Sequence, residues 1–232
     1  MLTAIHMMLP LCAIVLAFYA RAVTVKVLPL GDSITWGYQG SEPHSSNGYR
    51  KQLKDRLFSS GISTDFIGTQ SSGPMEDNEN EGHPGWTIRQ IQSGSENALK
   101  LDPDVVLLHA GTNDLNKAET EDEPYSGAPA RLRSLIDAVF QAKPNVTVLV
   151  ARITLTNNGN TNRRIFRFNV EVQKIVDEMR GNGRKIMVAD QGWVKEGDLG
   201  DGLHPNGQGY IHMGNIWYDA FIAARNQGWI ET

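Results

Sequence analysis

The sequence predicts an α/β protein in which helices cover both faces of a central parallel sheet. Short apolar segments, such as residues 105–110, alternate along the chain with longer segments whose apolar residues recur every three or four positions. A strand that is apolar throughout fits a sheet covered on both faces, and strands that alternate with helices fit parallel pairing. The 232 residues contain no repeat and no long linker, so one domain is expected.

Each element follows from its local pattern. Strands are expected where the chain is short, apolar and β-branched, over residues 23–30, 64–68, 105–110, 147–153 and 185–189. Helices are expected where the apolar spacing is helical, over residues 49–60, 87–99, 128–143, 162–180 and 210–224. The segment 71–85 is rich in Gly, Pro and acidic residues, and we expect a loop there.

The first 22 residues differ from the rest of the chain. Residues 7–20 form an apolar run interrupted only by Pro10, and Ala20-Arg21-Ala22 follows as a small-x-small site. This pattern predicts a signal peptide over residues 1–22, a domain over residues 23–232, and secretion to the extracellular space. Because the run is too short to span a bilayer comfortably, we expect no stable membrane association. The alternative is a buried or frayed helix, since residues 1–6 contain no Lys or Arg.

Composition excludes several classes of function. The formal net charge is −4, so no broad basic surface is expected to bind nucleic acid. Cleavage near Ala22 would remove Cys12, the only cysteine, and with it any thiol nucleophile, Cys-ligated zinc or disulfide. His44, His83, His109 and His212 lack a second ligand at metal-binding spacing, so no metal is expected. The protein is expected to be a monomer.

Two other features carry weaker predictions. Asn145-Val146-Thr147 is an N-x-S/T sequon, which makes Asn145 a candidate glycosylation site, although such triplets also occur by chance. The acidic residues of the segment 71–85 offer oxygen ligands of the kind that calcium takes. We expect a solvated loop there instead, and the residues concerned are Glu76, Asp77, Glu79 and Glu81.

Three polar motifs follow predicted strands or precede the last helix. They are Gly31-Asp32-Ser33, the segment 111–114 (GTND) and the segment 201–205 (DGLHP). A parallel sheet binds ligands beyond the carboxyl ends of its strands, so the three motifs are expected to converge there.

Ser33, His204 and Asp201 are the residue types that nucleophilic catalysis requires. A serine hydroxyl needs a base to remove its proton, and an imidazole, whose ordinary pKa is about 6.5, is the usual base. Asp201 lies three residues before His204 and can turn back to fix the imidazole tautomer. The alternative roles are a turn cap for Ser33 and a solvated loop carboxylate for Asp201. Asp32 and Asp114 are expected to hold loops by accepting backbone N–H bonds.

Attack on an ester would also need donors for the negative oxygen that develops. The candidates are the backbone N–H groups of Ser33 and Gly85 and the side-chain amide of Asn113, which does not titrate. The alternative role of Asn113 is to hold a loop in place.

Taken together, Gly31-Asp32-Ser33-Ile34, Gly85, the segment 111–114 and Asp201-x-x-His204 resemble the GDSL, or SGNH, hydrolase family. The resemblance implies a three-layer α/β/α flavodoxin-like fold, a catalytic triad of Ser33, Asp201 and His204, and an oxyanion hole of Ser33, Gly85 and Asn113. It alone selects Gly85 over its neighbouring loop glycines. Ile34 stands where the family name has leucine.

A narrower resemblance concerns the substrate. The segments 28–37 (LPLGDSITWG), 47–50 (NGYR) and 81–86 (EGHPGW) look like secreted acetylxylan esterases of carbohydrate esterase family three. This resemblance implies removal of acetyl groups from a polysaccharide, without a cofactor. Loop aromatics expected at the same edge are candidates to contact the sugar or to pack in the protein, namely Trp36, Tyr38, Trp86 and Tyr125.

Three alternatives stay open. The first keeps the chemistry and changes the substrate, as in a lysophospholipase, lipase or thioesterase. The second is a secreted carbohydrate-binding protein with an inactive site. The third is a metal-dependent phosphoesterase, which the sparse clustering of His and Asp disfavours.

Overall fold

A seven-stranded sheet forms the centre of the computed structural model, which describes residues 23–40 and 45–232. Five strands run parallel in the order β2-β1-β5-β6-β7, as β1 pairs with β2 on one side and with β5 on the other. Past the end of β2, β4 also pairs parallel with β1, and β3 pairs antiparallel with β4. The strands are β1 (Thr24–Gly31), β2 (Ser63–Phe66), β3 (Gln70–Ser71), β4 (Glu79–Gly82), β5 (Val105–His109), β6 (Thr147–Arg152) and β7 (Ile186–Asp190).

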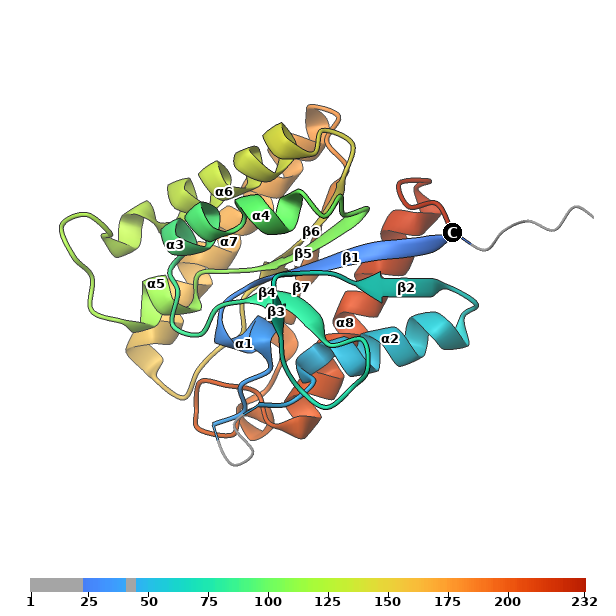
Figure 1. Ribbon diagram of the computed structural model, residues 1–232. Helices are drawn as coiled ribbons and strands as arrows, with labels where there is room; N and C mark the ends of the chain where they lie inside the picture. The colour runs from blue at the N-terminus through green and yellow to red at the C-terminus, as the bar shows by residue number, and fades with distance from the viewer. Residues whose placement is uncertain (1–22, 41–44) are drawn as a thin grey trace, which may run out of the picture.

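Helices cover both faces of this sheet (Figure 1). On one face lie α2 (Gly48–Ser59) and α8 (Gly207–Asn226). On the other face lie α3 (Ile88–Gly94), α4 (Glu96–Leu99), α6 (Ala128–Ala142) and α7 (Gly159–Gly181). Short helices at the loops are α1 (Ser33–Trp36), α5 (Thr112–Asn116) and the 3-10 turns η1 (Tyr125–Gly127), η2 (Gln191–Trp193) and η3 (Glu196–Asp198).

The two cores are built from alternate residues of the same strands. In β5, Val106 and Leu108 pack in the core beneath α3 and α6, whereas Val105 and Leu107 pack in the core beneath α2 and α8. Successive side chains of a strand point to opposite faces, so a strand buried on both sides must be apolar throughout. The predicted three-layer α/β/α fold is therefore confirmed.

The predicted elements agree with the structure to within a few residues. The short elements α1, β3 and α5 and the 3-10 turns were not predicted, and two expectations differ from the structure. The expected loop over residues 71–85 contains β4, whose side chains at Asn80 and Glu81 are buried and polar. Because the buried side chains of β4 are polar and hydrogen-bonded, this strand lacks the apolar pattern by which strands are predicted. The helix expected over residues 87–99 is divided, because the chain turns at Ser95, where the hydroxyl donates to the Gln92 carbonyl at 3.0 Å.

Several predictions are not tested by the residues that the structure describes. The predicted signal peptide over residues 1–22, with Cys12, lies outside the described residues, as does His44. Among the residues that are described, no helix is long and apolar enough to cross a membrane. Asn145 is exposed in the turn between α6 and β6, and its glycosylation stays a prediction.

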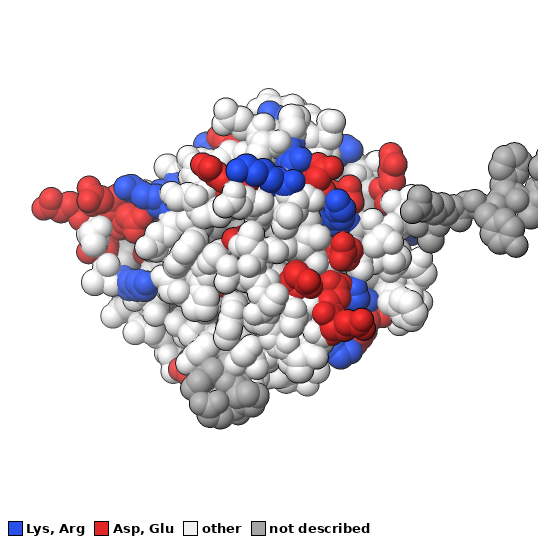
Figure 2. Space-filling view, viewed as in Figure 1, with Lys and Arg blue, Asp and Glu red and all other residues white. Residues whose placement is uncertain are grey.

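Charges of both signs are interspersed over the face of the molecule seen in Figure 2. Acidic side chains gather on the loop between α5 and η1, at the left of the view, and a second group lies at the lower right. That loop contributes Glu119, Glu121, Asp122 and Glu123. The absence of a nucleic-acid partner stays a prediction.

Gly111 sets the direction of the chain between β5 and α5, and we expect its replacement to destabilise the fold. Its φ of +123° disfavours any residue with a side chain, and a Cβ there would lie 2.8 Å from the Phe168 ring of α7. Gly111→Ala should lower the free energy of unfolding by about 1–3 kcal/mol in urea denaturation. The control is Gly181→Ala at the end of α7, where a Cβ meets nothing within 4 Å. Equal stability of the two variants would contradict the constraint.

Candidate active site

Ser33 lies where β1 ends and α1 begins. The turn is tight because β1 and β5 approach closely there, and a Cβ on Gly31 would lie 2.2 Å from the His109 carbonyl oxygen. Asp32 caps α1, accepting the Ile34 N–H at 3.0 Å. Ser33 is consequently the first residue of α1, at the carboxyl edge of the sheet.

The segment between η3 and α8 brings His204 onto Ser33. The distance from Ser33 Oγ to His204 Nε2 is 2.9 Å, and the distance from His204 Nδ1 to Asp201 Oδ2 is 2.8 Å. Asp201 Oδ1 also accepts the backbone N–H groups of Leu203 at 3.0 Å and His204 at 2.8 Å. The structure therefore joins the three predicted residues in one chain of contacts.

Hydrogen bonding keeps the Asp201 carboxyl ionised. Partial burial raises the pKa of Asp201, but hydrogen bonds from the His204 backbone and ring and from the Leu203 N–H outweigh it and hold the pKa below its usual value. A carboxylate at this position favours a proton on His204 Nδ1, which leaves Nε2 as the acceptor facing Ser33. That arrangement allows the imidazole to take a proton from the serine hydroxyl.

Backbone contacts fix the segment that carries His204. Leu199 pairs with Pro205 in an antiparallel bridge, and the Gly200 N–H donates to the His204 carbonyl at 2.8 Å. Asn206 then caps α8, accepting the Gly209 N–H at 3.0 Å. On its other side the imidazole meets the edge of the Tyr38 ring, with centroids 4.6 Å apart.

Two of the three predicted oxyanion donors, Gly85 and Asn113, lie in neighbouring segments that are hydrogen-bonded to each other. Gly85 has a φ of +83° within the turn closed by the Trp86 N–H to the His83 carbonyl. Two side chains from the α5 segment hold this turn, since Asn113 Nδ2 donates to the Trp86 carbonyl at 2.9 Å and Lys117 Nζ to the Gly85 carbonyl at 2.5 Å. The Asn113 amide has a second hydrogen, so one side chain can both hold the turn and donate to a ligand.

Glu81 was expected in a solvated loop, and that prediction is wrong. Its side chain is 1% exposed and accepts from the Thr69 N–H at 2.8 Å, and it lies 2.6 Å from His83 Nε2. The His83 ring stacks on Trp86 with centroids 3.7 Å apart and an interplanar angle of 8°. Glu81 thus supports the turn around Gly85. In an extended chain, residues two positions apart point to the same side, so the spacing of Glu81 and His83 was the sequence signal for their contact.

Two further aspartates hold loops, as predicted. Asp114 accepts the Ile88 N–H at 2.8 Å and the Arg131 Nε–H at 2.9 Å, which ties α5 to α3 and α6. Asp32 is fully buried, and burial raises its pKa to about 7.

His109 is also fully buried, and burial lowers its pKa to about 4, so this imidazole is neutral. Among the described residues, no group of His, Cys, Asp and Glu is arranged to hold a metal ion.

The predicted sugar-contacting aromatics have protein partners of their own. Trp86 packs on His83 and fills the space beside Gly94, where a Cβ would lie 2.3 Å from its ring. The Tyr125 ring lies beneath the Arg164 guanidinium at 4.2 Å, and its hydroxyl donates to the Lys117 carbonyl at 2.9 Å. Trp36 is half-buried at the end of α1. Contact of these three side chains with substrate stays a prediction.

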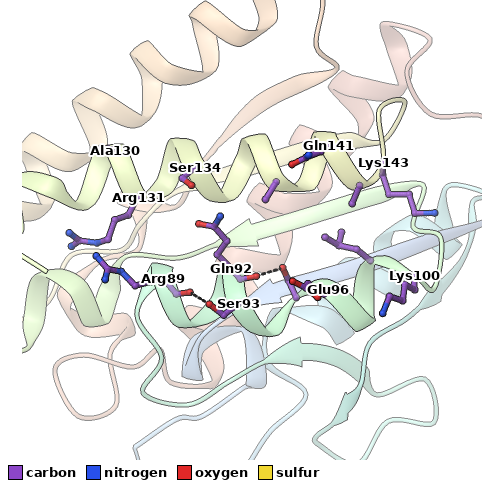
Figure 3. Close-up of a pocket in the computed structure, with 14 residues that line it drawn as sticks. Arg89, Gln92, Ser93, Glu96, Lys100, Ala130, Arg131, Ser134, Gln141 and Lys143 are labelled. Atoms are coloured by element: carbon purple, nitrogen blue, oxygen red, sulfur yellow. Dashed lines mark hydrogen bonds between the residues drawn. The ribbon is translucent and has the colours of Figure 1, made fainter. Parts of the chain in front are cut away.

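A groove of about 1040 Å³ lies elsewhere, between α3, α4 and α6 (Figure 3). Its lining includes neither Ser33 nor His204. Its cations are mostly paired, as Arg131 contacts Asp114 at 2.9 Å and Lys143 contacts Asp102 at 2.5 Å. The groove is therefore separate from the Ser33 site and holds little free positive charge for an anion.

Comparison with known proteins agrees with this fold and identifies the family. Residues 30–211 match the model of the GDSL-like lipase/acylhydrolase family, and the chain belongs to that family. Membership of this acylhydrolase family and the similarity to carbohydrate esterases support a carboxylic ester hydrolase.

Three individual proteins are similar to this chain over most of its length. The chain is similar to a family 3 carbohydrate esterase of Clostridium thermocellum, with 35% identity and a TM-score of 0.75 over 88% of this chain and 99% of that one. A family 3 carbohydrate esterase from Talaromyces cellulolyticus has 25% identity and a TM-score of 0.71 over the same shares. A multidomain esterase of Ruminococcus flavefaciens is 29% identical over 86% of this chain, which spans 29% of that protein.

Glu81→Gln should slow turnover while leaving substrate binding nearly unchanged, because Glu81 acts through the turn that carries Gly85. We expect kcat to fall about tenfold, less than the 10²–10³-fold cost of deleting an oxyanion donor, with KM changed less than about twofold. Steady-state kinetics on a nitrophenyl ester measure both. The matched control is Glu79→Gln, an exposed carboxylate on the same strand. Normal kcat in a folded Glu81→Gln protein would contradict the role.

Asp32→Asn should remove a pH dependence of stability that lies between about pH 4 and 7. Because burial raises the pKa of Asp32 to about 7, the native state holds this proton more tightly than the unfolded chain does, and stability falls as pH rises from about 4 to 7. Asparagine does not titrate, so urea unfolding should show the wild type losing up to about 1.4 kcal/mol per pH unit relative to Asp32→Asn. A difference between the two proteins that stays constant from pH 5 to 8 would refute the assignment.

Proposed function

We propose that this protein is a secreted serine esterase that removes acetyl groups from a polysaccharide, with acetylated xylan as the substrate. The observation that carries the proposal is the contact chain from Ser33 through His204 to Asp201. The turn with Gly85 is tied to the end of β1, two residues before Ser33, by the His83 N–H, which donates to the Gly31 carbonyl at 3.0 Å. The two family 3 carbohydrate esterases support the substrate class, and the pattern of residues 1–22 supports secretion.

The geometry supports an acyl-enzyme mechanism in two halves. Ser33 Oγ attacks the ester carbonyl carbon while His204 Nε2 takes the hydroxyl proton, and Asp201 stabilises the imidazolium. The carbonyl oxygen becomes negative and accepts hydrogen bonds from the Ser33 and Gly85 N–H groups and the Asn113 amide. The bond to the sugar oxygen then breaks, and His204 returns its proton to that oxygen.

Water completes the cycle. His204 Nε2 takes one proton from a water molecule, whose oxygen attacks the acetyl group on Ser33. Collapse of the second tetrahedral intermediate breaks the bond to Ser33 Oγ, which recovers the proton from His204. Acetate is released, and each step uses only groups of this chain and water, so no cofactor is required.

The polar surroundings of Ser33 favour a small acyl group. Ser33 Oγ contacts the His204 imidazole, which in turn meets the Tyr38 ring, and the end of β1 is hydrogen-bonded to the turn that contains Gly85. An acyl chain of many carbons would need an apolar groove to remove it from water, because each buried methylene contributes about 0.8 kcal/mol. A short acetyl group needs only the donors that polarise its carbonyl.

The experiment is hydrolysis of nitrophenyl esters from acetate to palmitate, with wild type and Ser33→Ala side by side. We expect acetate to be preferred, with kcat in Ser33→Ala at least about 10³-fold lower, as for other members of a catalytic triad. Preference for long chains would assign the protein as a lipase or lysophospholipase. Turnover that is the same in Ser33→Ala, or absent in both proteins, would overturn the esterase mechanism at this site.

A further inference from the structure

Trp193 is a large aromatic side chain that the protein leaves in solvent. It ends η2, directly after β7, and is 75% exposed. No hydrogen bond or ring contact engages its side chain within residues 23–40 and 45–232. An exposed tryptophan gains nothing for folding, and tryptophan is enriched at the centres of binding sites.

The Trp193 side chain borders a groove of about 310 Å³. The groove lies between the loop after β6, the first turn of α7, η2 and the segment before His204, and its lining includes Leu155, Thr156, Asn162, Trp193 and Leu199. Asn162 is fixed, since its Oδ1 accepts the Thr156 N–H at 2.8 Å and its Nδ2 donates to the Thr156 carbonyl at 2.7 Å. A wall held in this way is ordered before a ligand arrives, which lowers the cost of binding.

The groove shares structural parts with the Ser33 site. Leu199, in its lining, pairs with Pro205, the residue after His204. Next to Thr156, the Asn157 N–H donates to the Gly202 carbonyl at 2.8 Å, and Gly202 follows Asp201. The segment with Asp201 and His204 therefore lies against the elements that form the groove.

The sheet gives the spacing between the two sites. Ser33 follows β1, whereas the groove lies at the ends of β6 and β7, two and three strands along the same edge. At about 4.8 Å per strand, the separation is roughly 10–14 Å. This span is longer than one sugar and fits a short oligosaccharide.

From this arrangement we infer that the groove beside Trp193 binds sugar units of the polysaccharide chain at a distance from the acetylated unit at Ser33. Trp193 stacks on the apolar face of a pyranose ring, as a planar aromatic surface allows. Lys195 supplies a polar group in the same lining that can donate to a sugar hydroxyl. This inference rests on the proposed function, because it names how the same substrate extends beyond the reacting acetyl group.

Trp193→Ala tests the inference by separating polymer from small substrate. We expect kcat/KM on acetylated xylo-oligosaccharides to fall about tenfold through a higher KM, with nitrophenyl acetate hydrolysed at the wild-type rate. Trp193→Phe, which keeps an aromatic ring, should recover part of the loss. The matched control is Phe58→Ala, an equally exposed aromatic at the far end of α2 that should change neither substrate.

Calorimetry with unacetylated xylo-oligosaccharides measures binding without catalysis. The wild type should bind them, and Trp193→Ala should bind at least about tenfold more weakly, a loss of about 1.4 kcal/mol. Equal binding by the wild type and Trp193→Ala would overturn the inference. So would an equal loss of Trp193→Ala activity on acetylated xylo-oligosaccharides and on nitrophenyl acetate. Either result would leave the esterase function intact. Binding at Trp193 in a protein without serine-dependent hydrolysis would instead overturn the proposed function alone.

Discussion

The 2.9 Å contact between Ser33 Oγ and His204 Nε2 is the interaction on which the account of this protein depends. It joins residues 171 positions apart, one after the first strand and one before the last helix. In this fold β1 lies inside the sheet and α8 packs beside α2, and this arrangement brings the two ends together. The order of the strands therefore serves the site as well as the core.

Each partner of this contact is held by neighbouring residues of its own segment. Ser33 is fixed by the turn at Gly31 and the cap from Asp32, and His204 by Asp201 and the cap from Asn206. The Gly85 turn is held by Glu81, which contacts His83, and by Asn113 and Lys117 of the α5 segment, which donate to its carbonyl groups. Such a site reaches its geometry before substrate arrives, which is the condition under which hydrogen-bond donors stabilise developing charge.

The sequence was sufficient for the fold class and for the residues that converge on Ser33, because apolar periodicity and short motifs are local signals. It did not reveal β4 or the burial of Glu81, since a strand held by polar side chains has no apolar alternation. The exposed position of Trp193 could not be predicted either. Whether Trp193 packs inward or faces solvent depends on how β7 and the loop after β6 pack together. That packing cannot be predicted from the residues of either segment alone. The roles of Trp36, Trp86 and Tyr125 stay open for the same reason.

The central claim is that Ser33 carries the acyl group between the two halves of the reaction. Its most direct test is rapid acid quenching of the enzyme during turnover of nitrophenyl acetate, followed by mass spectrometry of its peptides, with Ser33→Ala treated in parallel. The account predicts a gain of one acetyl group on the peptide that contains Ser33, at the Ser33 side chain, and none on the corresponding peptide of the variant. An acetyl group on another residue, or an unmodified Ser33 while a burst of nitrophenol shows that acyl-enzyme has accumulated, would contradict it.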